Sequence, residues 1–319
     1  MKIVFLDSYT LNPGDLSWEP FMQWGDFVHY PDTLPEDVIQ RAQDAEVIIT
    51  NKVRLNEAHF TQLPKLKLIL VAATGYDVID TVAARNHGIT VCNCAGYGSR
   101  AVAQMVFAHL LEITNKVGYY TQLNITEKDW AKQTHFSYWH TPLEELDGKH
   151  IAVVGFGNIG REVVRLAHAF YMKVSVVSSK GAHELPDNVE KITLEEAIGK
   201  CDIISLCCPL TNANRGMINA ELLEKANPNL IFVNTARGGL IDESAMADAL
   251  TKGKIRAFCA DVLATEPPSP DCPLLGLPNA FITPHIAWAT REARMRIITI
   301  MHNNLKAFTE GAPINVVNP

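Results

Sequence analysis

The 319-residue sequence lacks the long apolar runs of a membrane protein. No stretch approaches the roughly 20 consecutive apolar residues of a transmembrane helix. The apolar start of the chain is interrupted at Asp7, and no small-residue cleavage site follows, so we do not expect a secretory signal peptide. These absences predict a cytoplasmic protein without a membrane partner.

A disulfide framework is also missing. The seven cysteines are an odd number without a repeating spacing, and Cys207 and Cys208 lie within an apolar run. This pattern is typical of reduced, partly buried thiols in a cytosol. Cys92 and Cys94 have no second Cys or His pair at ligand spacing, which favours a strand-to-loop transition over a metal site. We therefore predict no metal.

An excess of positive charge is absent as well. The 28 Lys and Arg residues are outnumbered by 35 Asp and Glu residues, which gives a formal net charge of −7. This balance argues against a general affinity for nucleic acid or anionic membranes. Any anionic ligand must therefore be bound by local cations or by helix N-termini. The hydrophobic content of 47% is typical of a soluble globular protein with a large core.

Short β-rich runs alternate with helical periodicity along the whole chain. This alternation predicts an α/β protein with parallel sheets that are covered on both faces. In the first series we expect strands at 3–6, 47–50, 68–71 and 89–92 and helices at 36–43, 57–62 and 79–86. In the second series we expect strands at 151–154, 174–177, 203–207, 230–234, 257–261 and 281–283.

A long apolar helix at 100–114 and an aromatic, less regular segment at 119–139 connect the two series. A last long helix is expected at about 290–309. The residues after 287 are too few for a domain, so they are assigned to the first one. The predicted domains are therefore 1–99 with 288–319, and 100–287. The active site of such a pair is expected in the cleft between them, at the carboxyl ends of strands.

A glycine-rich turn, Gly155-Phe156-Gly157-Asn158-Ile159-Gly160, separates the strand at 151–154 from a predicted helix at 161–170. Gly155 permits a tight turn, Gly157 lets the backbone approach a pyrophosphate, and Gly160 lets the helix pack closely on the strand. The N–H groups at the helix N-terminus, beside Asn158 and Ile159, can bind the phosphates. In this strand-to-helix context the motif predicts a dinucleotide site.

The acidic residue expected at the end of the next strand, where it would bind the adenosine ribose, is missing. Ser178 holds that place and is followed by Ser179 and Lys180. A serine does not repel a 2′-phosphate, and a lysine can attract one. The site should therefore accept NADP at least as well as NAD, unless Lys180 is only a solvated turn residue and both cofactors are used.

Three further strand ends carry an arginine, a glutamate and a histidine: Arg237, Glu266 and His285. Because parallel strands bring their carboxyl ends to one edge, these residues should lie near the glycine turn. Reduction of a 2-keto acid needs a cation for the carboxylate and carbonyl, for which a guanidinium is suited. The forming alkoxide needs a proton, which an imidazolium paired with a carboxylate can donate.

These motifs resemble the family of D-isomer-specific 2-hydroxyacid dehydrogenases over nearly the whole chain. The matching segments are 73–80, the glycine turn, 234–238, 261–267 and 283–288. The resemblance implies a Rossmann nucleotide-binding domain inserted into a discontinuous flavodoxin-like substrate domain, both doubly wound. In relatives the active unit is a dimer, built largely through the nucleotide domain and the segment before its glycine turn.

The resemblance also implies roles for individual residues. Arg237 would bind the substrate, His285 would be the acid/base and Glu266 its partner. Backbone N–H groups at Gly75 and Tyr76 would bind the substrate carboxylate. The cofactor would be lined by Cys208, Pro209, Thr235 and Ala236, with Asp261 on the nicotinamide carboxamide.

Within the family, residues 50–53, Tyr97 and the segment 285–294 look most like glycerate dehydrogenases, also called hydroxypyruvate reductases. Two residues depart from the pattern: Ala95 replaces a usual proline and Ala101 a frequent serine or threonine. Glu266 distinguishes the chain from formate dehydrogenases, which have glutamine there because formate oxidation transfers no proton. The sequence thus predicts reduction of a small 2-keto acid, foremost hydroxypyruvate, to the D-2-hydroxy acid.

Other functions stay open at this point. The same chemistry could act on glyoxylate or a longer 2-keto acid. 3-Phosphoglycerate is disfavoured, because the sequence shows no cluster of phosphate-binding arginines. A few relatives are transcriptional corepressors that use the fold as a dinucleotide-sensing module, but no peptide-docking feature is recognisable here.

Overall fold

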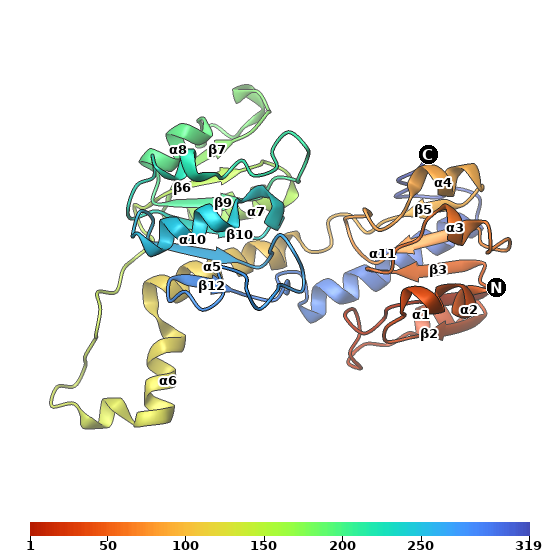
Figure 1. Cartoon of the computed structure of the whole chain (residues 1–319), viewed down its shortest axis with the longest axis horizontal. Helices are drawn as coiled ribbons and strands as arrows, with labels where there is room; N and C mark the ends of the chain where they lie inside the picture. The colour runs from red at the N-terminus through yellow and green to blue at the C-terminus, as the bar shows by residue number, and fades with distance from the viewer. The chain divides into compact units, whose positions relative to one another are not determined.

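The computed structural model describes all 319 residues, which form two α/β units (Figure 1). The first unit consists of Met1–Tyr97 and Ala289–Pro319, and the second is Gly98–Trp288. The second unit is thus inserted into the first. No helix combines the length and apolar character that crossing a membrane requires.

The first unit contains a five-stranded parallel sheet in the order β2-β1-β3-β4-β5, the doubly wound order of flavodoxin-like domains. Its strands are β1 (Lys2–Phe5), β2 (Asp26–His29), β3 (Val47–Thr50), β4 (Leu68–Val71) and β5 (Thr90–Cys92). Every residue of β3 and β4 is buried, as expected for apolar runs covered on both faces. The helices are α1 (Glu19–Met22), α2 (Val38–Ala42), α3 (Glu57–Phe60), α4 (Thr81–Asn86) and α11 (Arg291–Thr309), with a 3-10 turn η1 at Pro35–Asp37.

The C-terminal helix α11 belongs to this first unit. Thr290 caps its N-terminus by accepting a hydrogen bond from the Ala293 N–H. Farther along, the buried Asn304 donates from its amide to the Asn93 carbonyl beyond β5. Asn93 and Asn304 lie on opposite sides of the insertion, 211 residues apart in sequence, so the contact depends on the tertiary fold.

The second unit contains a seven-stranded parallel sheet in the order β12-β11-β10-β9-β6-β7-β8. Read from β8, this is the Rossmann order 3-2-1-4-5-6 with one strand added, so the predicted fold class is confirmed. The strands are β6 (His150–Val154), β7 (Lys173–Val177), β8 (Glu190–Lys191), β9 (Ile203–Leu206), β10 (Ile231–Asn234), β11 (Ala257–Ala260) and β12 (Ala280–Ile282).

Helices cover both faces of this sheet, and successive strand residues enter opposite cores. Ile203, for example, packs in one buried cluster and Ile204 in the other. The α-helices are α5 (Ser99–Asn115), α6 (Val117–Glu127), α7 (Asn158–Ala169), α8 (Leu194–Lys200), α9 (Ala220–Leu223) and α10 (Glu243–Thr251). The 3-10 turns are η2 (Asp129–Lys132), η3 (Ala182–Glu184) and η4 (Gly238–Leu240).

The aromatic segment at 119–139 was expected to be irregular, and its first half is instead helical. Helix α6 buries none of its residues, and Figure 1 shows it in yellow, projecting from the body of the second unit. Lys116, with a φ of 53°, separates it from α5. Because α6 has no apolar stripe to bury, hydrophobic periodicity does not indicate it.

Candidate active site

The carboxyl ends of the parallel strands in the second unit meet at one edge of the sheet. The glycine turn follows β6, Ser178 follows β7 and Cys208 lies just beyond β9. Arg237 follows β10 in the loop that leads into η4. Glu266 and His285 lie in the loops after β11 and β12. The predicted residues of this unit therefore gather along a single edge.

The glycine turn has the geometry that the motif predicts. Gly155 has a φ of +100°, and a Cβ there would lie 2.7 Å from the backbone nitrogen of Cys208. At Gly160 a Cβ would collide with the Gly155 carbonyl oxygen, whereas a Cβ on Gly157 would meet no atom within 4 Å. Two glycines thus permit close packing, and the third faces open space that a ligand can approach.

This open space adjoins the N-terminus of helix α7. The N-cap residue Gly157 has no side chain to satisfy the first N–H groups of the helix, which belong to Asn158, Ile159 and Gly160. These groups and the helix dipole favour an anion. The turn therefore fits the pyrophosphate of a dinucleotide.

No carboxylate stands at the end of β7. The Ser178 hydroxyl accepts a hydrogen bond from the Lys180 N–H at 3.2 Å, and both residues are half-buried. The nearest glutamate in this loop, Glu184, accepts from the Gly181 N–H at 2.8 Å. The position that recognises a free ribose 2′-hydroxyl in NAD-specific sites is therefore without its usual acid.

The Arg237 turn is built on a buried asparagine. Asn234 accepts from the Ala236 N–H at 3.1 Å and donates to the Arg237 carbonyl at 3.0 Å. The Arg237 guanidinium is exposed and donates to the Ala236 carbonyl at 2.8 Å. The buried Thr235 hydroxyl has no hydrogen-bond partner in the protein. An unsatisfied hydroxyl on the same sheet edge as the glycine turn suits a polar group of a bound cofactor.

Gly238 brings the arginine turn against the loop that carries the glutamate. A Cβ at Gly238 would overlap the Leu263 backbone, so only glycine permits this approach. The Leu263 N–H in turn donates to Glu266 Oε1 at 3.0 Å. The backbone thereby couples the position of Arg237 to that of Glu266.

Glu266 and His285 form a close pair. The His285 Nδ1–H donates to Glu266 Oε2 at 2.6 Å, and about a third of each side chain is exposed. The other ring nitrogen, Nε2, has no partner in the protein. An imidazole oriented by a carboxylate, with its second nitrogen free, is suited to donate and accept a proton.

The histidine turn is held by Asp261, a role that the sequence did not indicate. Oδ1 of this buried carboxylate accepts from the Thr283 hydroxyl at 2.6 Å and from the Ile286 N–H at 2.9 Å. Oδ2 accepts from the Ala287 N–H at 2.8 Å. These bonds enclose His285, whose φ is +53°, an uncommon value for a residue with a side chain.

A buried histidine on α5 extends this network. His109 Nε2 lies 3.4 Å from the Thr283 hydroxyl oxygen, which already donates to Asp261. The histidine is therefore the donor, and burial lowers its pKa in favour of this neutral form. Thr283 was within a matching segment but had no assigned role, and nothing in the spacing of His109 relates it to residue 283.

Cys208 and Pro209 line the end of β9. Burial raises the pKa of the Cys208 thiol, and it raises that of Cys207 to about 12. Both thiols are thus neutral near pH 7. The Pro209 carbonyl accepts from the Asn214 amide at 2.8 Å, which fixes the loop. The strand end therefore presents an uncharged surface.

Gly75 and Tyr76 lie in the loop after β4 of the first unit. Asn93 donates to the Thr74 carbonyl at 2.7 Å, and Thr74 donates to the Cys94 carbonyl at 2.8 Å, so neighbouring strand ends hold the loop. The N–H groups of Gly75 and Tyr76 donate to no group of the protein. Two free adjacent N–H groups can bind a carboxylate.

Comparison with known proteins identifies the family. Residues 107–287 match the family model described as "D-isomer specific 2-hydroxyacid dehydrogenase, NAD binding domain". A hydroxypyruvate reductase of Blautia hydrogenotrophica is 40% identical over 322 residues, which cover 100% of both chains. A glycerate dehydrogenase of Methylorubrum extorquens is 37% identical, with 99% of this chain and 98% of the relative covered.

A solved structure agrees with these matches. An acyclic imino acid reductase, in complex with NADPH and D-Arg, superimposes with a TM-score of 0.85 at 29% identity. The match covers 99% of this chain and 100% of the reductase. The chain belongs to the family of D-isomer-specific 2-hydroxyacid dehydrogenases.

Proposed function

We propose that the protein reduces hydroxypyruvate to D-glycerate with a reduced nicotinamide dinucleotide. The observation that supports this best is the Glu266–His285 pair, because its free Nε2 can supply the proton that a reduction requires. The names of the two similar relatives favour this substrate over other 2-keto acids.

The residues act together at the carbonyl group. A reduced nicotinamide dinucleotide held by the glycine turn would supply the hydride for this reduction. The Arg237 guanidinium binds the substrate carboxylate and polarises the carbonyl oxygen. His285 transfers the proton from Nε2 to that oxygen, and Glu266 stabilises the imidazolium before this transfer. In the reverse direction His285 removes the hydroxyl proton. The free N–H groups of Gly75 and Tyr76 bind the substrate carboxylate.

The chain's own groups also bind the cofactor. The glycine turn at 155–160 binds the pyrophosphate, and Cys208, Pro209, Thr235 and Ala236 line the dinucleotide. The remaining acceptor capacity of Asp261 binds the carboxamide. Ser178 and Lys180 accept NADP(H) at least as well as NAD(H), since no acid stands at the end of β7 to repel a 2′-phosphate.

The test crosses NADH and NADPH with hydroxypyruvate, glyoxylate, pyruvate and longer 2-keto acids in initial-rate measurements. We expect the highest kcat/KM with hydroxypyruvate. A higher kcat/KM with glyoxylate or a longer 2-keto acid would change the assigned substrate but not the proposed reaction. If the protein binds the dinucleotide but turns over none of these acids, the result would favour the alternative function, a dinucleotide-sensing module like that of the corepressors among its relatives.

The role of His285 is tested by His285→Ala. Removing the proton donor should reduce turnover by about 10²–10⁴-fold, while the dissociation constant of the cofactor stays nearly unchanged. Binding is measured by quenching of protein fluorescence and turnover by cofactor absorbance. Undiminished turnover in this variant would contradict the assignment of His285.

We further propose that the enzyme is a cytoplasmic homodimer. The aromatic segment at 119–139, called the projecting segment below, exposes large aromatic side chains. Trp130, Phe136 and Trp139 are 58%, 91% and 65% exposed. Exposed aromatic clusters of this kind are typical of subunit interfaces. All seven cysteines are free, which fits a reducing compartment.

A further inference from the structure

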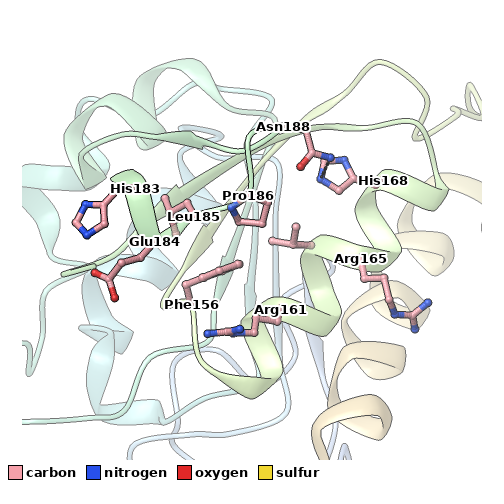
Figure 2. Close-up of a pocket in the computed structure, with 10 residues that line it drawn as sticks. Phe156, Arg161, Arg165, His168, His183, Glu184, Leu185, Pro186 and Asn188 are labelled. Carbon is pink, nitrogen blue, oxygen red and sulfur yellow. Dashed lines mark hydrogen bonds between the residues drawn. The ribbon is translucent and has the colours of Figure 1, made fainter. Parts of the chain in front are cut away.

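An open groove of about 480 Å³ runs along helix α7 on the second unit. Val164, Leu185 and Pro186 form part of its apolar lining, and Phe156 connects it to the glycine turn. Figure 2 shows Arg161, His183 and Glu184 toward one end and His168 and Asn188 toward the other. The groove thus begins beside the turn that binds the pyrophosphate in the proposed function.

The first end of the groove carries a cation without an acidic partner. Arg161, in the first turn of α7, has its guanidinium carbon 5.2 Å from the centre of the Phe156 ring. No carboxylate lies within ion-pair distance of it. The aromatic face therefore holds the guanidinium near the glycine turn and leaves its N–H donors free.

Two lysines, one in the adjoining loop and one in β8, also have no acidic partner. Lys180 follows the end of β7, and the Lys191 ammonium donates to the Lys180 carbonyl at 2.5 Å. Neither ammonium forms an ion pair within the protein. The single carboxylate of the groove, Glu184, is bound to the Gly181 N–H. This concentration of free cations is unexpected in a chain with a net charge of −7.

The loop geometry adds a fourth basic group. A Cβ at Gly181 would lie 2.5 Å from the His183 ring, so the glycine permits the ring to fold back over the loop. Figure 2 shows the His183 and Glu184 side chains on the same side of the groove as the Arg161 guanidinium. Arg161 from α7 and His183 from the loop after β7 thus line the same end of the groove.

We propose that Arg161 binds the 2′-phosphate of NADP(H) together with Lys180. A 2′-phosphate is a dianion, and an arginine fork with a free lysine is the donor set suited to it. This inference rests on the proposed cofactor site. It extends that site to a helical residue outside the motif and makes Arg161 a determinant of cofactor choice.

The test compares Arg161→Met with Arg165→Met. Arg165 lines the same groove on the same helix, but it is paired with Glu162 at 3.0 Å and points away from Arg161 in Figure 2. Binding of 2′,5′-ADP, 5′-AMP, NADPH and NADH is measured by isothermal titration calorimetry. Thermal unfolding of both variants verifies the fold.

We expect Arg161→Met to weaken 2′,5′-ADP and NADPH about tenfold or more, as loss of a phosphate-binding arginine does. Binding of 5′-AMP and NADH should change less than about twofold, and Arg165→Met should leave all four ligands nearly unchanged. Equal loss for ligands with and without the 2′-phosphate would instead assign Arg161 to the phosphates that all four ligands share, and no loss would remove it from the site. Failure of every dinucleotide to bind the unmodified protein would refute the proposed function itself.

Discussion

The carboxylate of Asp261 accepts three hydrogen bonds from the turn that carries His285. Each of these donors lies within two residues of the histidine in sequence. A buried carboxylate is stable only when such donors compensate for its lost hydration. The position of His285, the proposed acid/base, therefore depends on a group that need not touch the substrate.

Thr283→Val tests this dependence. The substitution keeps the shape of the side chain but removes a donor from Asp261 and an acceptor from His109. We expect a loss of about 1–3 kcal/mol in the free energy of unfolding, because two buried polar groups become unsatisfied. Turnover should fall severalfold as the His285 turn loosens, with cofactor binding less affected.

Thr283→Ser is the matched control, since it restores the hydroxyl. Urea unfolding and kcat are measured for both variants. If valine and serine reduced turnover equally, the hydroxyl would have no positioning role, and the effect would come from packing alone.

At the scale of elements, the close approach of Gly238 to Leu263 fixes the loop of Arg237 against the loop of Glu266. In Gly238→Ala the added methyl group would overlap the Leu263 backbone. Because a backbone cannot rotate away as a side chain can, the two loops must move apart. We expect a kcat/KM lower by about tenfold or more and a destabilisation of about 1–3 kcal/mol.

Gly199→Ala controls for the loss of glycine as such. Its nearest atom would be the Lys225 carbonyl oxygen at 3.7 Å, and the position is helical, so alanine fits. This variant should gain about 0.5–1 kcal/mol of stability with unchanged kinetics. Normal activity of Gly238→Ala would show that the loops tolerate separation.

Glu144 lies in the segment between η2 and β6 and forms ion pairs with two residues that precede strands β6 and β11. These contacts lie at the amino ends of the strands, on the side of the sheet opposite to the candidate site. The Glu144 carboxylate lies 2.6 Å from both the Arg256 guanidinium and the Lys149 ammonium. Hydrogen bonding to Arg256, and then to Lys149, lowers the pKa of Glu144 to about 2 from an ordinary 4.5. Because the folded state binds its proton less readily, the pair stabilises the fold above about pH 4.5 and ceases to do so as the pH falls through 2.

Glu144→Gln should therefore lower the free energy of unfolding by about 1 kcal/mol at pH 7. The difference from the unmodified protein should shrink between pH 4.5 and pH 2. Urea unfolding across this range measures it, with the exposed and unpaired Glu195→Gln as a control. A difference that does not change with pH would exclude the ion pairs as its source.

Elements were predictable from the sequence where one face or both are buried. Strand β3, Val-Ile-Ile-Thr, was predicted with its observed bounds because an apolar run of this length is typical of a covered parallel strand. The edge strand β2 is exposed at both ends and β8 has two residues, so neither produces such a run. Helix α6 escaped prediction for the same reason.

At the scale of the whole molecule, strand ends indicate better than local pattern which side chains lie at one edge of the sheet. Arg237, Glu266 and His285 could be grouped because parallel strands share an edge, without knowledge of any contact. The contact between His109 and Thr283 joins residues 174 positions apart, and no rule of spacing relates them. Topology is thus readable from the sequence, whereas the side-chain network that supports the site depends on packing.

The projecting segment is the part of the molecule least explained by a single chain. Phe136 is 91% exposed, and the Trp130 indole N–H donates to its carbonyl at 3.0 Å, so the ring is presented on an organised loop. Phe136→Ser should shift a homodimer toward the 35.3 kDa monomer in sedimentation equilibrium, with a dimer dissociation constant raised about tenfold or more. Val82→Ser, at a 70% exposed position on α4, should leave the association unchanged. A protein that sediments as a monomer without either substitution would leave the aromatic surface unexplained by self-association and would contradict the proposed dimer.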